Sequence, residues 1–326
     1  MAAAPAPAVP PPHPASGRAI GVVFNPRSHR NQRGEPAGAA LPGVMVAAPE
    51  RRADLRPALE RFAAAGAECI AISGGDGTVR DVLTAGMPLF GDHWPALAVI
   101  PAGKTNALGV DLGLPKEWHV AAVAAALGEG RRVVRRPLVV RDLEGNGALA
   151  GFVFGAGIFT TAIAAGQDAH RLGAFDSLAV GATAAWGLAQ ALLGSDRNRW
   201  RRGVPMTIRT GPELRELPRT RWGAPDRRTL LLAATLENLP LGVKPFGDLT
   251  GLKLAVLDHP RRRVLAMVPA IAAGWQSDWL ARNGVHRCAT SRIELALGDR
   301  FILDGEAFPA GRYEIAPGPE LSFVVP

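Results

Sequence analysis

The chain has 326 residues, of which 48% are hydrophobic and 20% are charged, so it is long enough to form two domains with cores of their own. Two cysteines, Cys69 and Cys288, are too few and too far apart in the sequence for a disulfide framework or a zinc site, which fits a reducing cytoplasm. The formal net charge of +8 is compatible with nucleic acid, an anionic membrane or an anionic substrate. Because all but four of the 37 basic residues are arginine, a skew that also follows from GC-rich codon usage, charge alone selects no partner.

The chain begins with a segment that predicts no fold. Residues 1–17 are almost entirely alanine and proline, and the prolines exclude the continuous apolar core of a secretory signal. We predict a disordered tail there. Residues 19–24 are predicted to form a buried strand, which Asn25-Pro26 ends in a turn, and a helix is predicted over residues 54–65.

A glycine-rich turn follows the next predicted strand, residues 69–73. The motif at residues 74–78 is Gly-Gly-Asp-Gly-Thr, and its glycines are expected to adopt backbone angles that other residues avoid and to let an anion approach the main chain. Thr78 and Asp81 form a capping pattern that predicts a helix over residues 79–87. A strand, a glycine turn and a helix N-terminus together favour phosphate binding, because amide N–H groups and the helix dipole attract negative charge.

Asp76 is the acidic residue within this turn. Because a carboxylate repels phosphate, we interpret Asp76 as a ligand of Mg²⁺ or as a base that takes a proton from an acceptor hydroxyl. The alternative, a tight turn whose aspartate bonds to local amides, stays open when the motif is considered alone.

A third strand is predicted over residues 96–100, and a polar turn, residues 101–106, follows it. Strands that alternate with helices indicate a parallel sheet covered on both faces, in which ligands bind at the carboxyl ends of the strands. All three turns lie at those ends. Lys104 is interpreted as a phosphate-neutralising or a solvated residue, and Asn106 as a helix cap or a ligand contact.

The pattern changes after a predicted helix over residues 118–127. Short apolar runs separated by glycine, proline and charge clusters then predict an antiparallel β domain. The runs are residues 138–141, 149–154, 204–210, 229–236, 252–257, 292–297 and 301–303. Two helices interrupt them, one around residues 266–281 and one over residues 172–193. The latter is interpreted as a buried or lid-like helix, because a membrane-spanning helix needs a cleaner apolar run.

The motif at residues 74–78 resembles the nucleotide-binding signature of the diacylglycerol kinase catalytic-domain family, which includes bacterial lipid kinases and sphingosine and ceramide kinases. Three more segments are similar to motifs of that family: Asn25-Pro26-x-Ser28, Pro101-x-Gly103 with Asn106, and Asp304-Gly305-Glu306. The chain departs from the family pattern at His29, Lys104 and Thr250. Taken alone, Asp304-Gly305 is also typical of a hairpin turn.

The resemblance implies a nucleotide-binding α/β domain with a parallel sheet over residues 18–130, to which residues near 305–326 are expected to return, and a lipid-binding antiparallel β-sandwich domain over residues 131–304. It implies a kinase that transfers the γ-phosphoryl group of ATP, with Mg²⁺, to the hydroxyl of diacylglycerol or a similar lipid. The expected catalytic residues are Asp304, Asp76 and Glu306, and Asp76 is also the expected metal ligand. The expected nucleotide-binding residues are Asn25, Gly74, Gly75, Gly77, Thr78, Gly103, Lys104, Thr105 and Asn106.

Two other readings of the chain stay open. NAD kinases share the glycine signature and act on a soluble substrate, although their usual Asn-Glu dipeptide is absent from the chain. The departures at His29, Lys104 and Thr250 are compatible with a non-catalytic homologue that binds a nucleotide or a lipid. Nucleic acid is not an expected partner, because no aromatic-rich basic strand pattern is present. We expect a cytoplasmic protein in peripheral contact with an anionic membrane, and a homodimer stays open.

Overall fold

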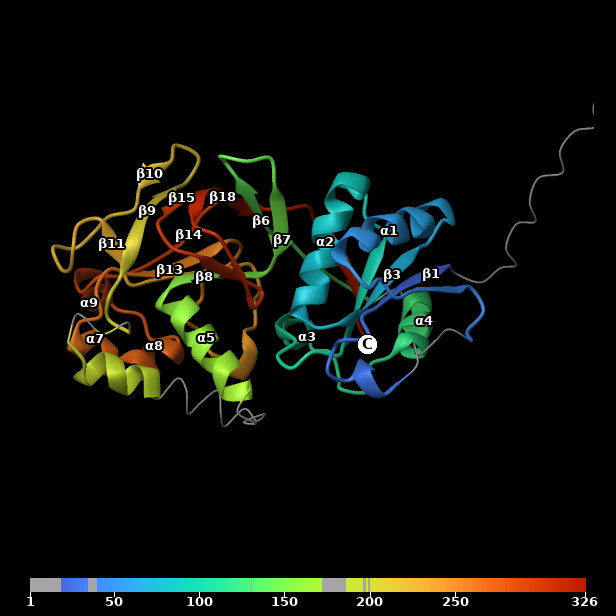
Figure 1. Cartoon of the computed structure of the whole chain (residues 1–326), viewed down its shortest axis with the longest axis horizontal. Coiled ribbons are helices and arrows are strands. Elements are labelled where there is room, and N and C mark those ends of the chain that lie inside the picture. The colour runs from blue at the N-terminus through green and yellow to red at the C-terminus, as the bar shows by residue number, and fades with distance from the viewer. Residues whose placement is uncertain (1–18, 35–39, 130, 172–185, 196–197, 199) are drawn as a thin grey trace, which may run out of the picture.

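The structure is a computed structural model and describes residues 19–34, 40–129, 131–171, 186–195, 198 and 200–326. Within these residues the chain forms two domains that lie side by side (Figure 1). The first contains one mostly parallel sheet with helices on both faces, and the second contains two antiparallel sheets. The predicted fold class is confirmed, whereas the predicted disordered tail lies outside the described residues.

Six strands form the sheet of the first domain, in the order β2-β1-β3-β4-β19-β5. All run parallel except β5, which is antiparallel to β19. The strands are β1 Ile20–Phe24, β2 Val44–Ala47, β3 Cys69–Gly74, β4 Ala96–Pro101, β5 Arg132–Arg135 and β19 Leu321–Val324. The last strand of the chain therefore lies in the first sheet, and so does β5, which comes after the predicted domain boundary at residue 130.

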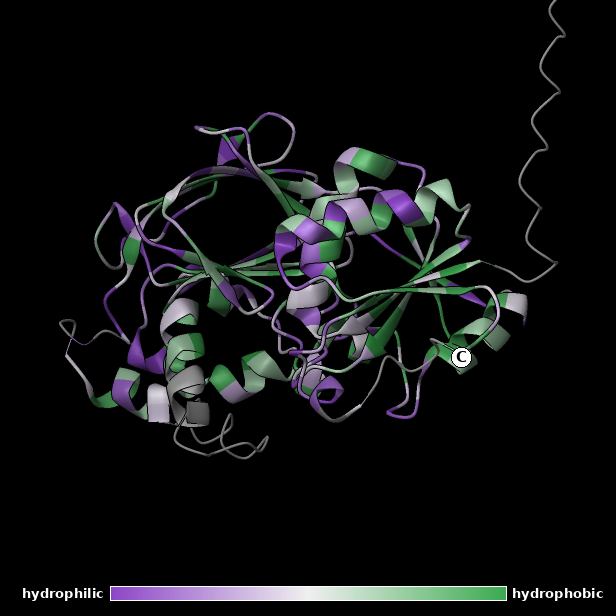
Figure 2. Ribbon diagram, turned by 45° about the vertical axis from the view of Figure 1, so that its right-hand side comes forward, coloured by the Kyte–Doolittle hydropathy of each residue, from purple (hydrophilic) through white to green (hydrophobic). Residues whose placement is uncertain are grey.

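Successive side chains of β3 point to opposite faces of the sheet, and both faces are covered by helices. Ile70 and Ile72 pack in one buried cluster with residues of α1 and α2, whereas Cys69 and Ala71 pack in another with α4. Figure 2 shows the hydrophobic strands enclosed between these helices. The helices of the domain are α1 Leu55–Ala64, α2 Asp76–Phe90, α3 Ala107–Asp111 and α4 Val120–Glu129, with short 3-10 helices η1 Asn31–Arg33 and η2 Arg52–Asp54.

The second domain is a β-sandwich whose two sheets share one core. Ile208 and Leu295 of the first of these sheets pack with Phe154 and Leu254 of the other. The first has the order β10-β9-β15-β18-β6-β7, with β11 beside β9, and the other has the order β14-β13-β12-β8-β16-β17. The strands are β6 Leu138–Asp142, β7 Ala148–Gly151, β8 Val153–Gly157, β9 Val204–Thr210, β10 Arg215–Glu216, β11 Arg227–Arg228, β12 Leu230–Ala234, β13 Lys253–Leu257, β14 Val285–Ala289, β15 Ile293–Leu297, β16 Phe301–Leu303, β17 Glu306–Phe308 and β18 Gly311–Pro317.

The two domains meet along helix α2 and strand β7. Ala150 and Phe152 belong to the same buried cluster as α1 and α2, and the Phe152 ring lies 6.4 Å from the ring of Phe323 in β19. The Ala150 amide N–H also donates to Thr84 Oγ1 at 3.0 Å. The core of the first domain therefore continues into the second, which fixes their relative position.

Helix α2 begins earlier than the sequence indicated. Gly75 is its N-cap with extended backbone angles, φ −95° and ψ −176°, and the helix starts at Asp76 rather than at residue 79. The predicted capping pair is wrong, because the Thr78 hydroxyl bonds to Asn25 and the Asp81 carboxylate bonds to arginines instead.

The predicted helix around residues 266–281 is three short helices. They are α7 Arg262–Ala266, α8 Val268–Ala272 and α9 Asp278–Arg282. Gly274, with φ +96°, follows α8, and Ser277 starts α9 by accepting a hydrogen bond from the Trp279 amide at 3.2 Å.

The remaining helical elements of the second domain are α5 Ile158–Arg171, the 3-10 helix η3 Pro240–Gly242 and a helix at residues 186–193. The last is the end of the predicted helix over residues 172–193, of which residues 172–185 lie outside the described part. In the part of the chain that the structure describes, no helix combines the length and the apolarity needed to cross a bilayer.

Candidate functional site

The glycine turn lies at the carboxyl end of β3 and opens helix α2. Its glycines are not needed for unusual backbone angles, because none of Gly74, Gly75 and Gly77 has a positive φ. Close packing explains two of them instead. A Cβ on Gly74 would lie 2.4 Å from the Thr78 hydroxyl oxygen, and a Cβ on Gly75 would lie 3.0 Å from the Cα of Gly103.

Gly77 is different, because few atoms of the described residues lie near the place where its side chain would be. A Cβ there would meet only a guanidinium nitrogen of Arg80, at 3.8 Å. The first-turn amides of a helix have no partners within the helix and attract anions. Open space at the N-terminus of α2 therefore fits a phosphate group that approaches the main chain.

Side-chain hydrogen bonds connect the turn after β1, which begins at Asn25, to the glycine turn. Asn25 Nδ2 donates to Thr78 Oγ1 at 2.8 Å, and Asn25 Oδ1 accepts from the Arg27 amide at 3.0 Å. Asn31, which sequence analysis missed, donates to the carbonyl oxygens of Asn25 and Ser73 at 2.8 and 3.1 Å. No motif marks Asn31, because one partner follows β1 and the other lies in β3, far away in the sequence.

The third turn is brought against the glycine turn by the contact of Gly103 with Gly75. Asn106 closes this turn: its side chain accepts from the Gly103 amide and donates to the Gly103 carbonyl, both at 2.8 Å. It stands at the N-cap of α3 with φ 50° but makes no side-chain cap bond, so its predicted capping role is wrong. Lys104 and Thr105 are exposed on the same turn.

A cavity of about 320 Å³ opens beside these turns. It has an apolar part and a basic part, and the hydrogen-bonded pair Asn25 and Thr78 belongs to its wall. The lining residues are Val23, Asn25, Arg27, Pro49, Glu50, Arg51, Arg52, Leu55, Thr78 and Asp81. Its size and mixed chemistry are typical of small-molecule sites.

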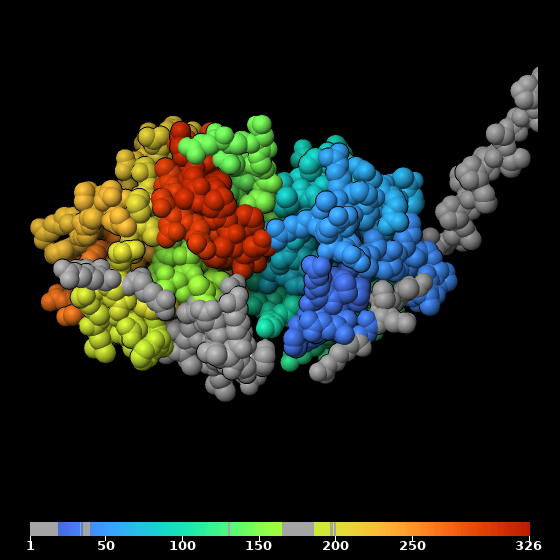
Figure 3. Space-filling view, viewed as in Figure 1, coloured from blue at the N-terminus to red at the C-terminus, as the bar shows by residue number. Residues whose placement is uncertain are grey.

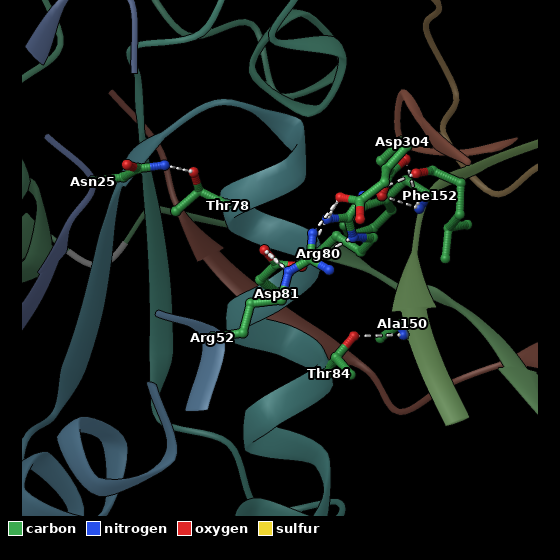
Figure 4. Close-up of polar contacts among 11 residues, drawn as sticks. Asn25, Arg52, Thr78, Arg80, Asp81, Thr84, Ala150, Phe152 and Asp304 are labelled. Atoms are coloured by element: carbon green, nitrogen blue, oxygen red, sulfur yellow. Dashed lines mark hydrogen bonds and ion pairs between the residues drawn. The ribbon is translucent and has the colours of Figure 1, made fainter. Parts of the chain in front are cut away.

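Asp304 reaches this region from the second domain. It forms a two-residue hairpin turn with Gly305 between β16 and β17, and both residues have positive φ, 45° and 82°. The hairpin interpretation of Asp304-Gly305 is thus confirmed. The Asp304 carboxylate accepts from the amides of Phe152 and Val153 at 3.0 and 2.9 Å (Figure 4).

The environment of Asp304 keeps its carboxyl group easy to protonate. Burial and the nearby Asp76 carboxylate raise the pKa of Asp304 to about 7, against the opposing effects of the Phe152 and Val153 amides and of Arg80. Burial also raises the pKa of Asp76, whose Oδ1 accepts from the Leu108 amide at 3.3 Å. Two carboxyl groups with raised pKa values, one from each domain, therefore influence each other at the N-terminus of α2.

Glu306, the third predicted acidic residue, is engaged in ion pairs. Its Oε2 accepts from Arg80 Nη2 at 2.6 Å and from Arg52 Nη2. Burial would raise its pKa, but the bonds and charges of Arg52 and Arg80 outweigh burial and lower the pKa. In Figure 3 the C-terminal part of the chain, in red, reaches the edge of the first domain, in blue.

The first domain is similar in sequence to a known catalytic domain. Residues 20–135 match the sequence profile of the diacylglycerol kinase catalytic domain. This segment of the chain is therefore similar to the catalytic domain of diacylglycerol kinases. The matched segment contains the turn after β1, the glycine turn and the Asn106 turn.

Individual relatives match limited parts of the chain. The diacylglycerol kinase of Bacillus subtilis (strain 168) is 29% identical over 137 residues, which are 38% of this chain and 42% of that protein. Lipid kinase YegS of Escherichia coli (strain K12) is 34% identical over 64 residues, which are 20% of this chain and 21% of that protein. The chain thus matches less than half the length of either relative.

The fold agreement extends further than the sequence agreement. A crystal structure of a diacylglycerol kinase from Bacillus anthracis (strain Sterne) matches 96% of this chain and 98% of that chain, with a TM-score of 0.62 and 16% identity. The chain therefore shares its two-domain fold with that protein.

Proposed function

We propose that this protein transfers the γ-phosphoryl group of ATP to the hydroxyl group of a lipid, diacylglycerol or a similar one. The observation that carries the proposal is the Asp304 carboxyl group, which has a pKa of about 7 and is electrostatically coupled to Asp76 at the glycine turn. A group with such a pKa is suited to take a proton from a hydroxyl at neutral pH. Asp304 is the proposed base, and the lipid hydroxyl is the attacking group.

In this proposal the nucleotide occupies the 320 Å³ cavity with its phosphates toward Gly77 and Thr78. The apolar wall formed by Val23, Pro49 and Leu55 suits the base and ribose, and the arginines suit the phosphates. Asn25 and Asn106 hold the neighbouring turns in place rather than acting on the phosphates themselves. Phosphoryl transfer depends mainly on such positioning and on charge stabilisation.

A divalent metal fits this donor set. Among the residues that the structure describes, no three His, Cys, Asp or Glu side chains are grouped so as to hold a metal. Asp76 would provide a carboxylate ligand, and Mg²⁺ commonly takes one or two carboxylates together with water and substrate phosphates. The metal would supply neutralisation of the phosphate charge.

A lipid substrate requires contact with a membrane surface, and one basic surface of the second domain suits that contact. Arg262 Nε donates to the Leu192 carbonyl at 3.0 Å, beside Trp186 and Leu193, which are 64% and 84% exposed. Arginines line an adjoining cavity of about 550 Å³, formed by Gly194, Ser195, Arg201, Trp222, His259, Arg261, Arg262 and Arg263. We propose that this surface contacts anionic phospholipid by charge attraction and by apolar insertion.

Vesicle sedimentation tests the membrane contact separately from the chemistry. Binding to phosphatidylglycerol vesicles is expected at low salt and should weaken as salt rises, because the Debye length is about 8 Å near physiological ionic strength. Neutral phosphatidylcholine vesicles are the control. Equal binding to both kinds of vesicle, or none at low salt, contradicts the electrostatic contact.

The decisive test of the activity is transfer of label from [γ-³²P]ATP in the presence of Mg²⁺. A panel of diacylglycerol, ceramide and sphingosine in mixed micelles is compared with NAD as a soluble acceptor, and Asp304→Asn is the matched inactive variant. Label in a lipid product with the parent protein supports the proposal. Label in NAD alone assigns a soluble acceptor, and ATP binding without label transfer identifies a non-catalytic homologue.

A further inference from the structure

Arg80 is buried where the two domains meet, and neither the motifs nor the proposed reaction gives it a role. It lies on α2, four residues after Asp76 and four before Thr84, and its side chain is 2% exposed. Residues four apart share one face of a helix, so these three side chains form a row along α2. Thr84 bonds to Ala150 and Asp76 influences Asp304, so this row faces the second domain.

The Arg80 guanidinium holds both ends of the turn that carries Asp304. Its Nη1 donates to the carbonyl oxygen of Leu303 at 3.2 Å, and its Nη2 donates to Glu306 Oε2 at 2.6 Å. Leu303 and Glu306 are the paired residues that flank the two-residue turn. A planar guanidinium makes both bonds at once, which fixes the position and the direction of the turn relative to α2.

The same network reaches the cavity proposed for the nucleotide. Asp81 accepts from Arg80 Nη2 at 2.7 Å and from Arg52 Nε at 2.9 Å, and Arg52 also pairs with Glu306. Arg52 and Asp81 both line the 320 Å³ cavity. Figure 4 shows these side chains between the Asn25–Thr78 pair and the Asp304 turn.

We propose that Arg80 is a positioning residue that fixes the Asp304 turn of the second domain against the Asp76 end of α2, so that the base contributed by one domain meets the phosphates held by the other. This inference rests on the proposed kinase function. Arg80 acts through Asp304 and needs no contact with either substrate.

The charge of Arg80 gives this role a signature in the pH profile. The charged groups that act on Asp304 from α2 are Asp76, which raises its pKa, and Arg80, which lowers it. Asp81, also on α2, and Arg52 and Glu306 on the adjoining elements form ion pairs with one another and with Arg80. Removing the Arg80 charge therefore raises the pKa of Asp304, and the acidic limb of the kcat profile moves to higher pH.

Two substitutions separate the geometry from the charge. Arg80→Met removes both, so we expect kcat to fall about tenfold to a hundredfold, because small misplacements of a catalytic group are costly, and we expect the acidic limb to move upward. Arg80→Lys keeps the charge, but one ammonium cannot reproduce the planar fork that joins Leu303, Glu306 and Asp81. It should lower kcat while leaving the acidic limb close to that of the parent, and neither variant should change the KM for ATP as much as kcat.

Arg228 supplies the matched control, because it is also buried, 1% exposed, and paired with an aspartate, Asp258, at 2.6 Å, away from the Asp304 turn. Arg228→Lys should lower the unfolding temperature without altering the pH profile of kcat. Arg80 and Glu306 should also be coupled, so the effects of Arg80→Met and Glu306→Gln on kcat should be less than additive in the double variant. The positioning role is contradicted if folded Arg80→Met has a kcat within twofold of the parent and the acidic limb of its kcat profile does not move.

If the parent protein transfers label to no acceptor, the kinase proposal is wrong. The environment of Asp304 can then be measured without an activity assay. NMR titration of ¹³C-labelled aspartate side chains gives the pKa of Asp304 in the parent, in Arg80→Lys and in Arg80→Met. A higher pKa in Arg80→Met alone supports the coupling between the domains. An identical pKa in all three proteins contradicts it, whatever reaction the protein catalyses.

Discussion

Two aspartates of the second domain, Asp304 and Asp258, have opposite environments. Asp258 is surrounded by donors: Arg228 Nη1 at 2.6 Å, His286 Nε2 at 2.9 Å, and the Thr220 amide and hydroxyl at 2.8 and 3.0 Å. Burial would raise its pKa, but the bonds to His286 and Thr220 and the charges of His286 and Arg228 outweigh burial and lower the pKa.

Asp304 has two backbone amide donors, and its strongest neighbouring charge of like sign is Asp76. The pKa of Asp304 is accordingly raised to about 7. A carboxylate satisfied on all sides stabilises the fold, whereas one held beside another carboxylate is available to exchange a proton. Asp258 therefore has the environment of a structural aspartate, and Asp304 has the environment that suits the base we propose.

The largest expected effect is on catalysis by Asp304→Asn. The amide keeps the size of the side chain and its ability to accept from the Phe152 and Val153 amides, but it cannot take a proton at neutral pH. Loss of a general base typically lowers kcat about 10²-fold to 10⁴-fold, and ATP affinity should change little. Single-turnover assays with labelled ATP and titration of Mg·ATP binding measure the two quantities. Near-parental turnover by this variant removes Asp304 as the base and leaves it as a turn residue.

Asp258→Asn should show the reverse pattern. It leaves the Arg228 guanidinium buried without its counter-charge, and breaking a buried pair in this way costs about 3–5 kcal/mol of unfolding free energy. Turnover by the fraction that remains folded should equal that of the parent, since Asp258 lies outside the proposed site. Urea unfolding followed by fluorescence gives the stability, and the assay is run below the transition. A fall in kcat comparable to that of Asp304→Asn would erase the distinction between the two aspartates.

A similar contrast between filled and open space separates Gly75 from Gly77. Gly77→Val puts a side chain where the nearest protein atom to its Cβ is a guanidinium nitrogen of Arg80, at 3.8 Å. We therefore expect the fold to persist and the affinity for ATP to fall at least about tenfold, as the phosphates are kept from the helix N-terminus. Gly75→Ala is the matched control, because its Cβ meets the Gly103 backbone at 3.0 Å and should lower stability instead. Calorimetric titration with ATP and thermal unfolding are measured on both variants. Unchanged ATP affinity in Gly77→Val places the phosphates elsewhere.

Much of the α/β domain was predictable, because its signals are local in the sequence. The strand at residues 69–73 and the glycine turn after it are contiguous, and both occur where the sequence indicated. The reason for the glycines was not predictable: Gly75 is required by Gly103, which belongs to another turn. A contact between two turns leaves no periodicity in either segment.

The arginine network was missed for the same physical reason. Arg80 follows the glycine motif directly, but its partners Leu303 and Glu306 come from the opposite end of the chain. Glu306 was expected to assist catalysis because it completes the Asp-Gly-Glu motif, and the structure pairs it with Arg52 and Arg80. A catalytic role for Asp304, Asp76 and Glu306 stays a prediction.

The smallest expected effect is on the pH dependence of the free energy of unfolding, which compares Asp304 and Asp258 directly. The pKa of Asp304 is raised from about 3.9 in an unfolded chain to about 7. Its contribution to the free energy of unfolding is therefore complete below pH 4 and is lost as the pH rises toward 7, and it amounts to at most about 4 kcal/mol. The pKa of Asp258 is lowered, so its contribution is present above pH 4 and is lost as the pH falls below that value. Asp304→Asn should therefore gain stability over the parent between pH 4 and pH 8, while the deficit of Asp258→Asn should shrink below pH 4. Urea unfolding of the parent and both variants at pH 3.5, 5 and 8 measures these slopes. Parallel curves for the parent and Asp304→Asn would show that the Asp304 carboxyl group titrates alike in the folded and unfolded chain, which is incompatible with its use as a base near pH 7.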